Sequence, residues 1–351
     1  MNGRLLLWTG GYGADEAGTA DIRRVWLDPA TGGLADGGAA ARTANPSFLA
    51  AHPRGDLLYA VNERDGAGAV TGFSVGPGAT LTETGSVPTG GGAPCHLFAH
   101  PAGQRLVVAN YQDGSVSVHP LTATGAPGPH ELLLPGSGHG PDPERQEGPH
   151  AHSVTPAPGG RHLLVADLGT DQLRRYPADP GTGAVEGSGG SAARLPGGTG
   201  PRHVAVHPGG HLYAAGELDA RVHVLRWDPA SATARHVAAV AATEATSTRA
   251  YPSEIVLAPG GRRLYVANRG PDTVTVFAVE EDGAVLRRLA EVPTAGTWPR
   301  HMALVAGHLV VANQRSDELT VLRIDAGSGI PHPTAHRLST PRPACVLPAV
   351  G

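Results

Sequence analysis

The amino-acid sequence predicts an all-β fold in which short antiparallel strands recur around a closed ring. Three observations support this prediction. The chain of 351 residues contains 50 Gly and 32 Pro, far above ordinary usage, and these residues punctuate short apolar runs as turns do. One sequence unit recurs along the chain. The 3.6-residue apolar period that a helical repeat would need is missing.

The repeated unit starts at a proline. Successive starts are 48, 55, 52, 51 and 47 residues apart, at Pro46, Pro94, Pro149, Pro201, Pro252 and Pro299. In the unit PSEIVLAPGGRRLYVANRGPDTVTVFAV, an alternating run, a Pro-Xaa-Gly turn and a second apolar run precede another turn and a third strand. A Gly-rich turn and a looser fourth strand complete the unit. Four antiparallel strands at this period are typical of a β-propeller blade.

The two ends of the chain supply a seventh blade. Residues 343–347 have the pattern of a first strand with no further strand after them. Residues 5–9, 22–27 and a stretch up to Asn45 supply the remaining strands. We therefore predict one domain over residues 1–351, a seven-bladed β-propeller closed by the N-terminal strands plus a C-terminal strand. Such closure pairs the open edges that sheets otherwise expose.

Composition argues against several classes of protein. The formal net charge is −4 and the sequence contains no lysine, so there is no basic field for nucleic acid. The apolar run at residues 5–8 is too short for a signal peptide, and no transmembrane stretch follows. Two cysteines, Cys95 and Cys345, give no disulfide framework. We expect a soluble cytoplasmic protein without nucleic-acid or membrane partners, and a monomer by default.

Blade geometry predicts a shared polar site at one mouth of the central channel. First strands start at one face of the ring and second strands return to it, so these strand ends share a rim. The first-strand set is His96, His152, Arg202, His203, Glu254, Arg300 and His301. The second-strand set is Asn62, Glu63, Asn110, Asp167, Glu217, Asn268, Arg269, Gln314 and Arg315. A concave mouth of this kind is a common place for a small-molecule site.

Four motifs resemble a known family, the seven-bladed lactonases of the bacterial 6-phosphogluconolactonase type, which share their fold with the fungal carboxy-muconate lactonizing enzymes. The motifs are Gly148-Pro149-His150-Ala151-His152-Ser153, Gly200-Pro201-Arg202-His203, Gly216-Glu217-Leu218, and Ser253-Glu254 with Asn268-Arg269-Gly270. The resemblance covers essentially the whole chain. One departure is Gly216, where the family usually has Asn, and it puts any role of that amide in doubt.

Geometry and resemblance together predict a catalytic set of His152, Glu217, Arg202 and Arg269. Lactone opening needs a base that activates water and donors that stabilise an oxyanion. We assign His152 and Glu217 to the base and its orienting partner, with the order left open, and the arginines to the substrate's phosphate or carboxylate. The predicted substrate-binding residues are His96, His150, His203, Glu254, Arg300 and Arg315.

Two features near His152, the His150-Ala151-His152 pair and the segment 135–148, each have two possible interpretations. Alignment of the turns sets His152 opposite Arg202 and leaves His150 in a short insertion. A His-Xaa-His pair can bind a metal, but no third ligand at metal spacing is evident and a rim arginine would repel a cation. We therefore expect no metal and no cofactor. The Gly/Pro/charge-rich segment at 135–148 is either a lid over the site or a surface insertion.

The functional prediction is hydrolysis of a sugar-type lactone, with 6-phosphogluconolactone implied by the resemblance. One alternative keeps the site but changes the reaction to muconate-type lactonization, since fold does not choose between the two chemistries. Another is a propeller that binds a protein or metabolite without catalysis. Aromatic residues make up only 4% of the chain, which leaves few anchors for a protein partner. A nucleophilic cysteine enzyme is disfavoured.

Overall fold

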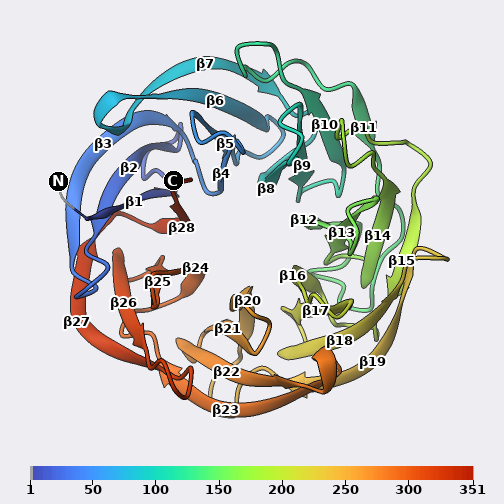
Figure 1. Ribbon diagram of the computed structural model, residues 1–351. Helices are drawn as coiled ribbons and strands as arrows, with labels where there is room; N and C mark the ends of the chain where they lie inside the picture. Colours follow the sequence, from blue (N-terminus) through green and yellow to red (C-terminus); the bar gives the residue numbers. More distant parts are fainter. Residues whose placement is uncertain (1–2, 351) are drawn as a thin grey trace.

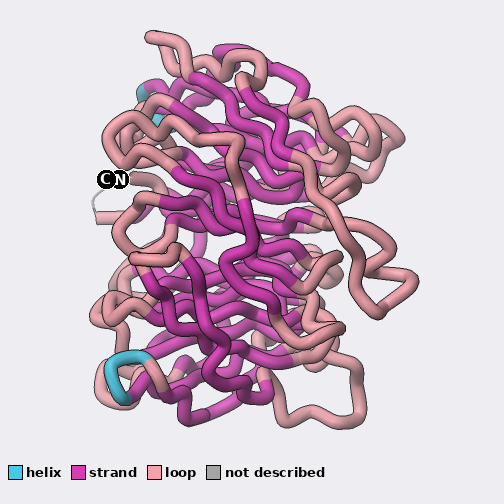
Figure 2. Tube along the Cα trace, turned by 90° about the vertical axis from the view of Figure 1, so that its right-hand side faces the viewer, coloured by secondary structure: helices cyan, strands magenta, loops and turns pink. Residues whose placement is uncertain are grey.

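The computed structural model describes residues 3–350 and consists of seven four-stranded antiparallel sheets arranged in a ring (Figure 1). The predicted seven-bladed β-propeller is therefore confirmed. Seen from the side, the strands pass through the thickness of the ring and the loops gather at its two faces (Figure 2).

The innermost strand of each blade lies next to the ring axis (Figure 1). These strands are β4 (Leu49–Ala51), β8 (Pro94–Ala99), β12 (Ala151–Pro156), β16 (Pro201–Val206), β20 (Tyr251–Leu257), β24 (Pro299–Val305) and β28 (Pro343–Pro348). The second strands are β1 (Leu5–Gly11), β5 (Leu57–Asn62), β9 (Arg105–Asn110), β13 (His162–Asp167), β17 (His211–Gly216), β21 (Arg263–Arg269) and β25 (His308–Asn313).

The third and fourth strands form the outer part of each blade. The third strands are β2 (Thr19–Leu27), β6 (Ala69–Gly76), β10 (Val116–Pro120), β14 (Gln172–Pro177), β18 (Arg221–Asp228), β22 (Thr273–Glu280) and β26 (Glu318–Ile324). The outer strands are β3 (Leu34–Ala44), β7 (Thr80–Pro88), β11 (Leu132–Leu134), β15 (Gly190–Arg194), β19 (Thr233–Ala241), β23 (Val285–Pro293) and β27 (Pro331–Ser339). Two short 3-10 helices, η1 (Pro77–Ala79) and η2 (Glu281–Gly283), lie in turns.

The blade that closes the ring has the strand order β28-β1-β2-β3. Strand β28 pairs antiparallel with β1, with Thr9 opposite Val346 and Gly10 opposite Cys345. The Thr9 hydroxyl also donates to the Cys345 carbonyl at 2.9 Å. The C-terminal strand therefore supplies the inner edge of a blade whose other three strands come from the N-terminus, as predicted.

Second strands are buried on both sides because neighbouring blades pack against each other. Every residue of β5, Leu57–Asn62, is buried, and so is every residue of β17. The sequences of such strands are continuous apolar runs and do not alternate between apolar and polar residues. Buried tyrosines strengthen the packing, since the hydroxyls of Tyr213 and Tyr265 each donate at 2.8 Å to a glycine carbonyl of the following blade.

No helix within residues 3–350 is long and apolar enough to cross a membrane.

Candidate active site

The Asn, Asp or Gly that ends the apolar run of a second strand, here called the strand-end residue, and the residue after it make different contacts. Asn268 Nδ2 donates to the Ala242 carbonyl and to Thr275 Oγ1, both at 3.0 Å. Asn313 Nδ2 donates to Thr320 Oγ1 at 2.8 Å. Asn268 therefore joins its blade to the preceding one, whereas Asn313 joins β25 to β26 within one blade. The residue after the strand-end position instead reaches inner-strand side chains, as seen for Glu63, Tyr111 and Glu217.

Gly216 occupies the strand-end position of the β16–β19 blade, where the other five units that follow an opening proline between Pro46 and Pro299 have Asn or Asp. A Cβ added at Gly216 would lie 2.2 Å from Asp219 Oδ1, so the Asp219 side chain fills the space of the missing amide. Asp219 Oδ2 in turn lies 2.8 Å from His223 Nε2. The departure is thus compensated inside the blade, and the place of Glu217 is unaffected.

Backbone bonds fix Glu217 at the start of the turn after β17. Its amide donates to the Gly200 carbonyl at 2.9 Å, and Leu218 N donates to the Thr199 carbonyl at 3.1 Å. Gly200 has a positive φ of 57°, a region that favours glycine, and its own amide donates to Asp171 Oδ1 at 2.8 Å. The turn that carries Glu217 is therefore tied to the segment that leads into Arg202.

Three arginines surround the Glu217 carboxylate. Arg269 Nη2 lies 2.6 Å and Arg202 Nε lies 3.3 Å from Oε2, while Arg145 Nη2 lies 2.7 Å from Oε1. Burial by itself would raise the pKa of Glu217, but the arginines outweigh it and bring this pKa down to about 2. Glu217 is consequently an anion at neutral pH, and in this state it is a poor proton acceptor.

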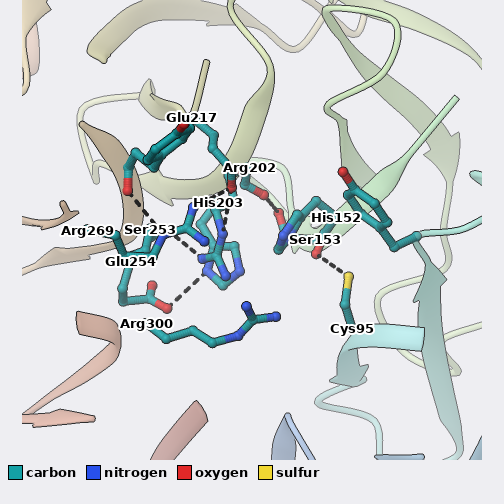
Figure 3. Close-up of polar contacts among 12 residues, drawn as sticks. Cys95, His152, Ser153, Arg202, His203, Glu217, Ser253, Glu254, Arg269 and Arg300 are labelled. Atoms are coloured by element: carbon teal, nitrogen blue, oxygen red, sulfur yellow. Dashed lines mark hydrogen bonds and ion pairs between the residues drawn. The ribbon is translucent and has the colours of Figure 1, made fainter. Parts of the chain in front are cut away.

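The arginines are themselves held by carbonyl oxygens. Arg202 Nη1 donates to the Ser253 carbonyl at 2.7 Å (Figure 3). Arg269 Nε donates to the Tyr251 carbonyl at 3.1 Å. Burial, followed by the neighbouring arginine charges, lowers the pKa of Arg202 to about 10. Arg202 therefore remains cationic at neutral pH, so this rim presents fixed positive charge.

His152 stands beside this arginine cluster as a neutral imidazole. Burial, followed by the charge of Arg202, holds the pKa of His152 well below its usual value. Its Nδ1 is buried and has no hydrogen-bond partner among residues 3–350. The Tyr111 ring lies edge-on to it, with 5.6 Å between ring centroids. A neutral imidazole with a free nitrogen can accept a proton from water.

A second polar group lies on the neighbouring inner strands. Glu254 Oε2 is 3.0 Å from His203 Nδ1 (Figure 3) and 3.1 Å from His301 Nε2. Burial raises the pKa of Glu254 and keeps the pKa of His203 well below its usual value. His96 packs at 4.3 Å, between ring centroids, against Phe48. Phe48 also helps to line an apolar cavity of about 380 Å³ formed by residues of β4, β8, β12 and β28.

The remaining predicted residues lie around this centre. Arg300 Nη2 is 3.9 Å from Glu63 Oε1, and Glu63 also accepts a hydrogen bond from Tyr12 at 2.7 Å. Arg315 is exposed and stacks 3.4 Å over the Trp298 ring.

His150 stacks on the Tyr111 ring, with 4.5 Å between ring centroids, and contacts a neighbouring turn. Its Nδ1 is 2.7 Å from the Tyr111 carbonyl and its Nε2 is 3.1 Å from Glu147 Oε1. Both ring nitrogens thus have partners. Within residues 3–350, no three His, Cys, Asp or Glu side chains are placed to hold a metal ion together.

Both cysteines are buried free thiols. Cys95 Sγ donates to the His152 carbonyl at 3.4 Å (Figure 3), and burial raises the pKa of this thiol. Burial likewise raises the pKa of Cys345 to about 12. Neither thiol is activated as a nucleophile would be.

Sequence reasoning missed two side chains at the centre, Tyr111 and Arg145. Tyr111 follows the strand-end residue Asn110, so alignment of the repeats with Glu217 could have found it. Arg145 lies in the segment 135–148, which is outside the repeated unit. Alignment of the repeats therefore cannot predict its contact with Glu217. Its contact shows that this segment extends over the rim.

Comparisons with known proteins agree with this architecture. The family model described as "Lactonase, 7-bladed beta-propeller" matches residues 7–348. A 6-phosphogluconolactonase of Bacillus subtilis (strain 168) is 31% identical over 336 residues, which covers 94% of this chain and 95% of that protein. An uncharacterized protein of Lactococcus lactis subsp. lactis is 28% identical over 99% of this chain and 100% of its own length.

Solved structures give the same result. A periplasmic gluconolactonase of Pseudomonas aeruginosa superposes with a TM-score of 0.89 at 28% identity and covers 99% of both chains. The match to the family model runs from β1 into β28, and it includes the inner strands that carry His152, Arg202 and Glu254. This chain belongs to the lactonase family of seven-bladed β-propellers.

Proposed function

We propose that this protein hydrolyses a sugar-type lactone that carries an anionic group, of which 6-phosphogluconolactone is the example suggested by the names of its relatives. The observation that supports this most is the Glu217 carboxylate enclosed by three arginines beside a neutral His152. Fixed cations recognise an anionic substrate, and a neutral imidazole can take the proton of an attacking water.

In the proposed reaction, water adds to the lactone carbonyl while His152 accepts its proton. The tetrahedral intermediate carries negative charge on the former carbonyl oxygen, which Arg202 and Arg269 stabilise. Collapse of the intermediate breaks the bond to the ring oxygen, which leaves as an alcohol and takes the proton back from His152. Glu217 keeps Arg202 and Arg269 in place.

Substrate binding itself would strengthen the base. After burial, the nearby charge of Arg202 is the next cause of the low pKa of His152. An anion bound between the arginines offsets that charge, so the pKa of His152 rises when substrate is present. In this proposal His203, Glu254 and Arg300 complete the wall around the sugar, with His96 below them and with Arg315 and His150 at the periphery.

A pH-stat assay on a panel of lactones, with and without chelator, tests the proposal. We expect chelator-insensitive hydrolysis of 6-phosphogluconolactone, and a fall in kcat of about 10²- to 10⁴-fold in His152→Asn, since a general base contributes about this much. Glu217→Gln is also expected to lose turnover. His332→Asn, an exposed change on β27, is the matched control.

Each other outcome has a definite meaning. Full activity in His152→Asn would remove the histidine from the mechanism. Absence of lactone hydrolysis by the wild-type protein, combined with ring closure of a muconate-type dicarboxylate, would replace the proposal by the lactonizing reaction.

A further inference from the structure

Arg145 is the exposed member of the arginine cluster around Glu217. Its side chain is 35% exposed, whereas those of Arg202 and Arg269 are only 4% and 7% exposed. Arg145 Nη2 donates to Glu217 Oε1 at 2.7 Å and to the Tyr111 hydroxyl at 3.1 Å. An anionic ligand that approaches from solvent therefore meets Arg145 before it meets the two buried cations.

The backbone beneath Arg145 is firmly anchored. The adjacent Gln146 is completely buried, and its Nε2 donates at 2.8 Å both to the Leu168 carbonyl and to Asp171 Oδ1. The Arg145 amide itself donates to Asp142 Oδ1 at 3.2 Å. Any movement of the guanidinium must therefore come from rotation of its own side chain, without opening of the segment 135–148.

The two oxygens of Glu217 have different partners. Oε2 contacts Arg269 at 2.6 Å and Arg202 at 3.3 Å, and both of these arginines are buried and held by carbonyl groups. Oε1 contacts Arg145. Rotation of Arg145 would consequently free Oε1 while Oε2 keeps both of its cations, so that Glu217 stays in place.

We propose that Arg145 is a specificity-determining residue that exchanges its partner when substrate binds. The phosphate or carboxylate of the lactone takes the Arg145 guanidinium from Glu217, and the freed Oε1 accepts a hydrogen bond from the attacking water or a sugar hydroxyl. This inference rests on the proposed lactonase function. An arginine suits the exchange because its planar guanidinium binds carboxylate and phosphate equally well, through paired hydrogen bonds.

Kinetics on two lactones that differ only in a phosphate test the exchange. The substrates are 6-phosphogluconolactone and the unphosphorylated glucono-lactone, and the variants are Arg145→Gln, Arg145→Lys and Arg161→Gln. Arg161 is exposed and lies in the β12–β13 turn, at the opposite end of the strands from the rim. Thermal unfolding of each variant establishes that it is folded.

We expect Arg145→Gln to lose about 10- to 100-fold in kcat/KM on the phosphorylated lactone, as for the loss of a hydrogen bond to a charged group. On the unphosphorylated lactone its kcat/KM should stay the same or rise, because Oε1 is no longer occupied. Arg145→Lys should recover part of the discrimination, and Arg161→Gln should behave as wild type. Equal losses on both lactones, or no loss on either, would overturn the inference.

A binding measurement separates this inference from the proposed function. If the wild-type protein hydrolyses neither lactone, the proposed function fails. Calorimetric titration with inorganic phosphate then still tests Arg145. Weaker phosphate binding by Arg145→Gln than by Arg161→Gln would support anion capture by this residue, and identical affinities would contradict it.

Discussion

At the scale of single residues, the centre of the ring keeps its histidines neutral. His96, His152, His203 and His301 are buried, and burial is the main cause that lowers the pKa of each of them. Since an imidazolium ion without solvation is costly, the folded state resists protonation at these positions. Because these histidines are neutral, the positive charge that can bind an anion at this site comes from the arginines.

This neutrality predicts how stability depends on pH. The pKa of His301 falls to about 4 in the folded state, mainly through burial, against about 6.5 for an unperturbed histidine. Because the unfolded chain takes up the proton first, the stabilising contribution is present above pH 6.5 and is lost as pH falls toward 4. His301→Asn should reduce the slope of unfolding free energy against pH by about 1.4 kcal/mol per unit.

Urea unfolding at several pH values between 7 and 4 measures that slope. His332→Asn, on the exposed face of β27, is the matched control. A slope in His301→Asn equal to that of wild type would show that the imidazole is protonated in the folded protein as well.

At the scale of strands, the sequence predicts where each element lies better than where its side chains point. The apolar runs in the sequence predicted the positions of β21 and β25, and the sequence fragments at both chain ends predicted those of β1 and β28. The same reasoning grouped Asn268 with Arg269 as rim residues. Alternation along a strand sends neighbours to opposite sides. Asn268 therefore bonds to Thr275 of its own blade and to the Ala242 carbonyl of the preceding blade, while Arg269 reaches Glu217.

Contacts made by Arg145 and Gln146 could not be derived in this way. The segment 135–148 is an insertion outside the repeat, and its course depends on specific bonds such as Gln146 to Leu168 and Asp171. Hydrogen bonds of this kind join residues far apart in sequence and leave no periodic pattern. The position of Tyr111, by contrast, follows from the repeat once the register of the strand ends is known.

Adjacent residues on β21 should therefore respond differently to mutation. Asn268→Ala is expected to cost about 1–3 kcal/mol of stability, because it leaves buried partners without a hydrogen bond, and to leave kcat/KM unchanged. Arg269→Gln should do the reverse and remove most turnover. Urea unfolding together with the lactone assay checks both, and a loss of kcat in a fully stable Asn268→Ala protein would contradict the assignment.

At the scale of the whole molecule, closure of the ring joins the two ends of the chain in one sheet. Strand β28 contributes Val346 and Cys345 to the buried core, and Ala349 N donates to the Leu6 carbonyl at 3.0 Å. The inner strands around the ring carry His152, Arg202 and Glu254, so the mutual placement of these residues depends on the blade interfaces. Opening the ring at one blade would disturb contacts between strands such as β16 and β20.

Deletion of residues 343–351 should therefore abolish the stable fold. Removal of β28 loses the burial of Val346, about 1.5–3 kcal/mol for such a side chain, together with the ladder to β1 and the packing of its neighbours. These losses are comparable with the about 5–15 kcal/mol that typically stabilises a folded protein. The exposed edge of β1 should also promote aggregation, which light scattering and circular dichroism melts would detect.

A circular permutant distinguishes the loss of this strand from the change at the chain end. Linking residue 351 to residue 1, with new ends between Thr246 and Ser247, keeps all four strands of the closing blade, because the cut lies in the exposed segment between β19 and β20. The permutant should unfold cooperatively and retain lactone hydrolysis, whereas the truncated protein should do neither. A truncated protein that melts at the same temperature as the full chain would show that blade packing alone closes the ring.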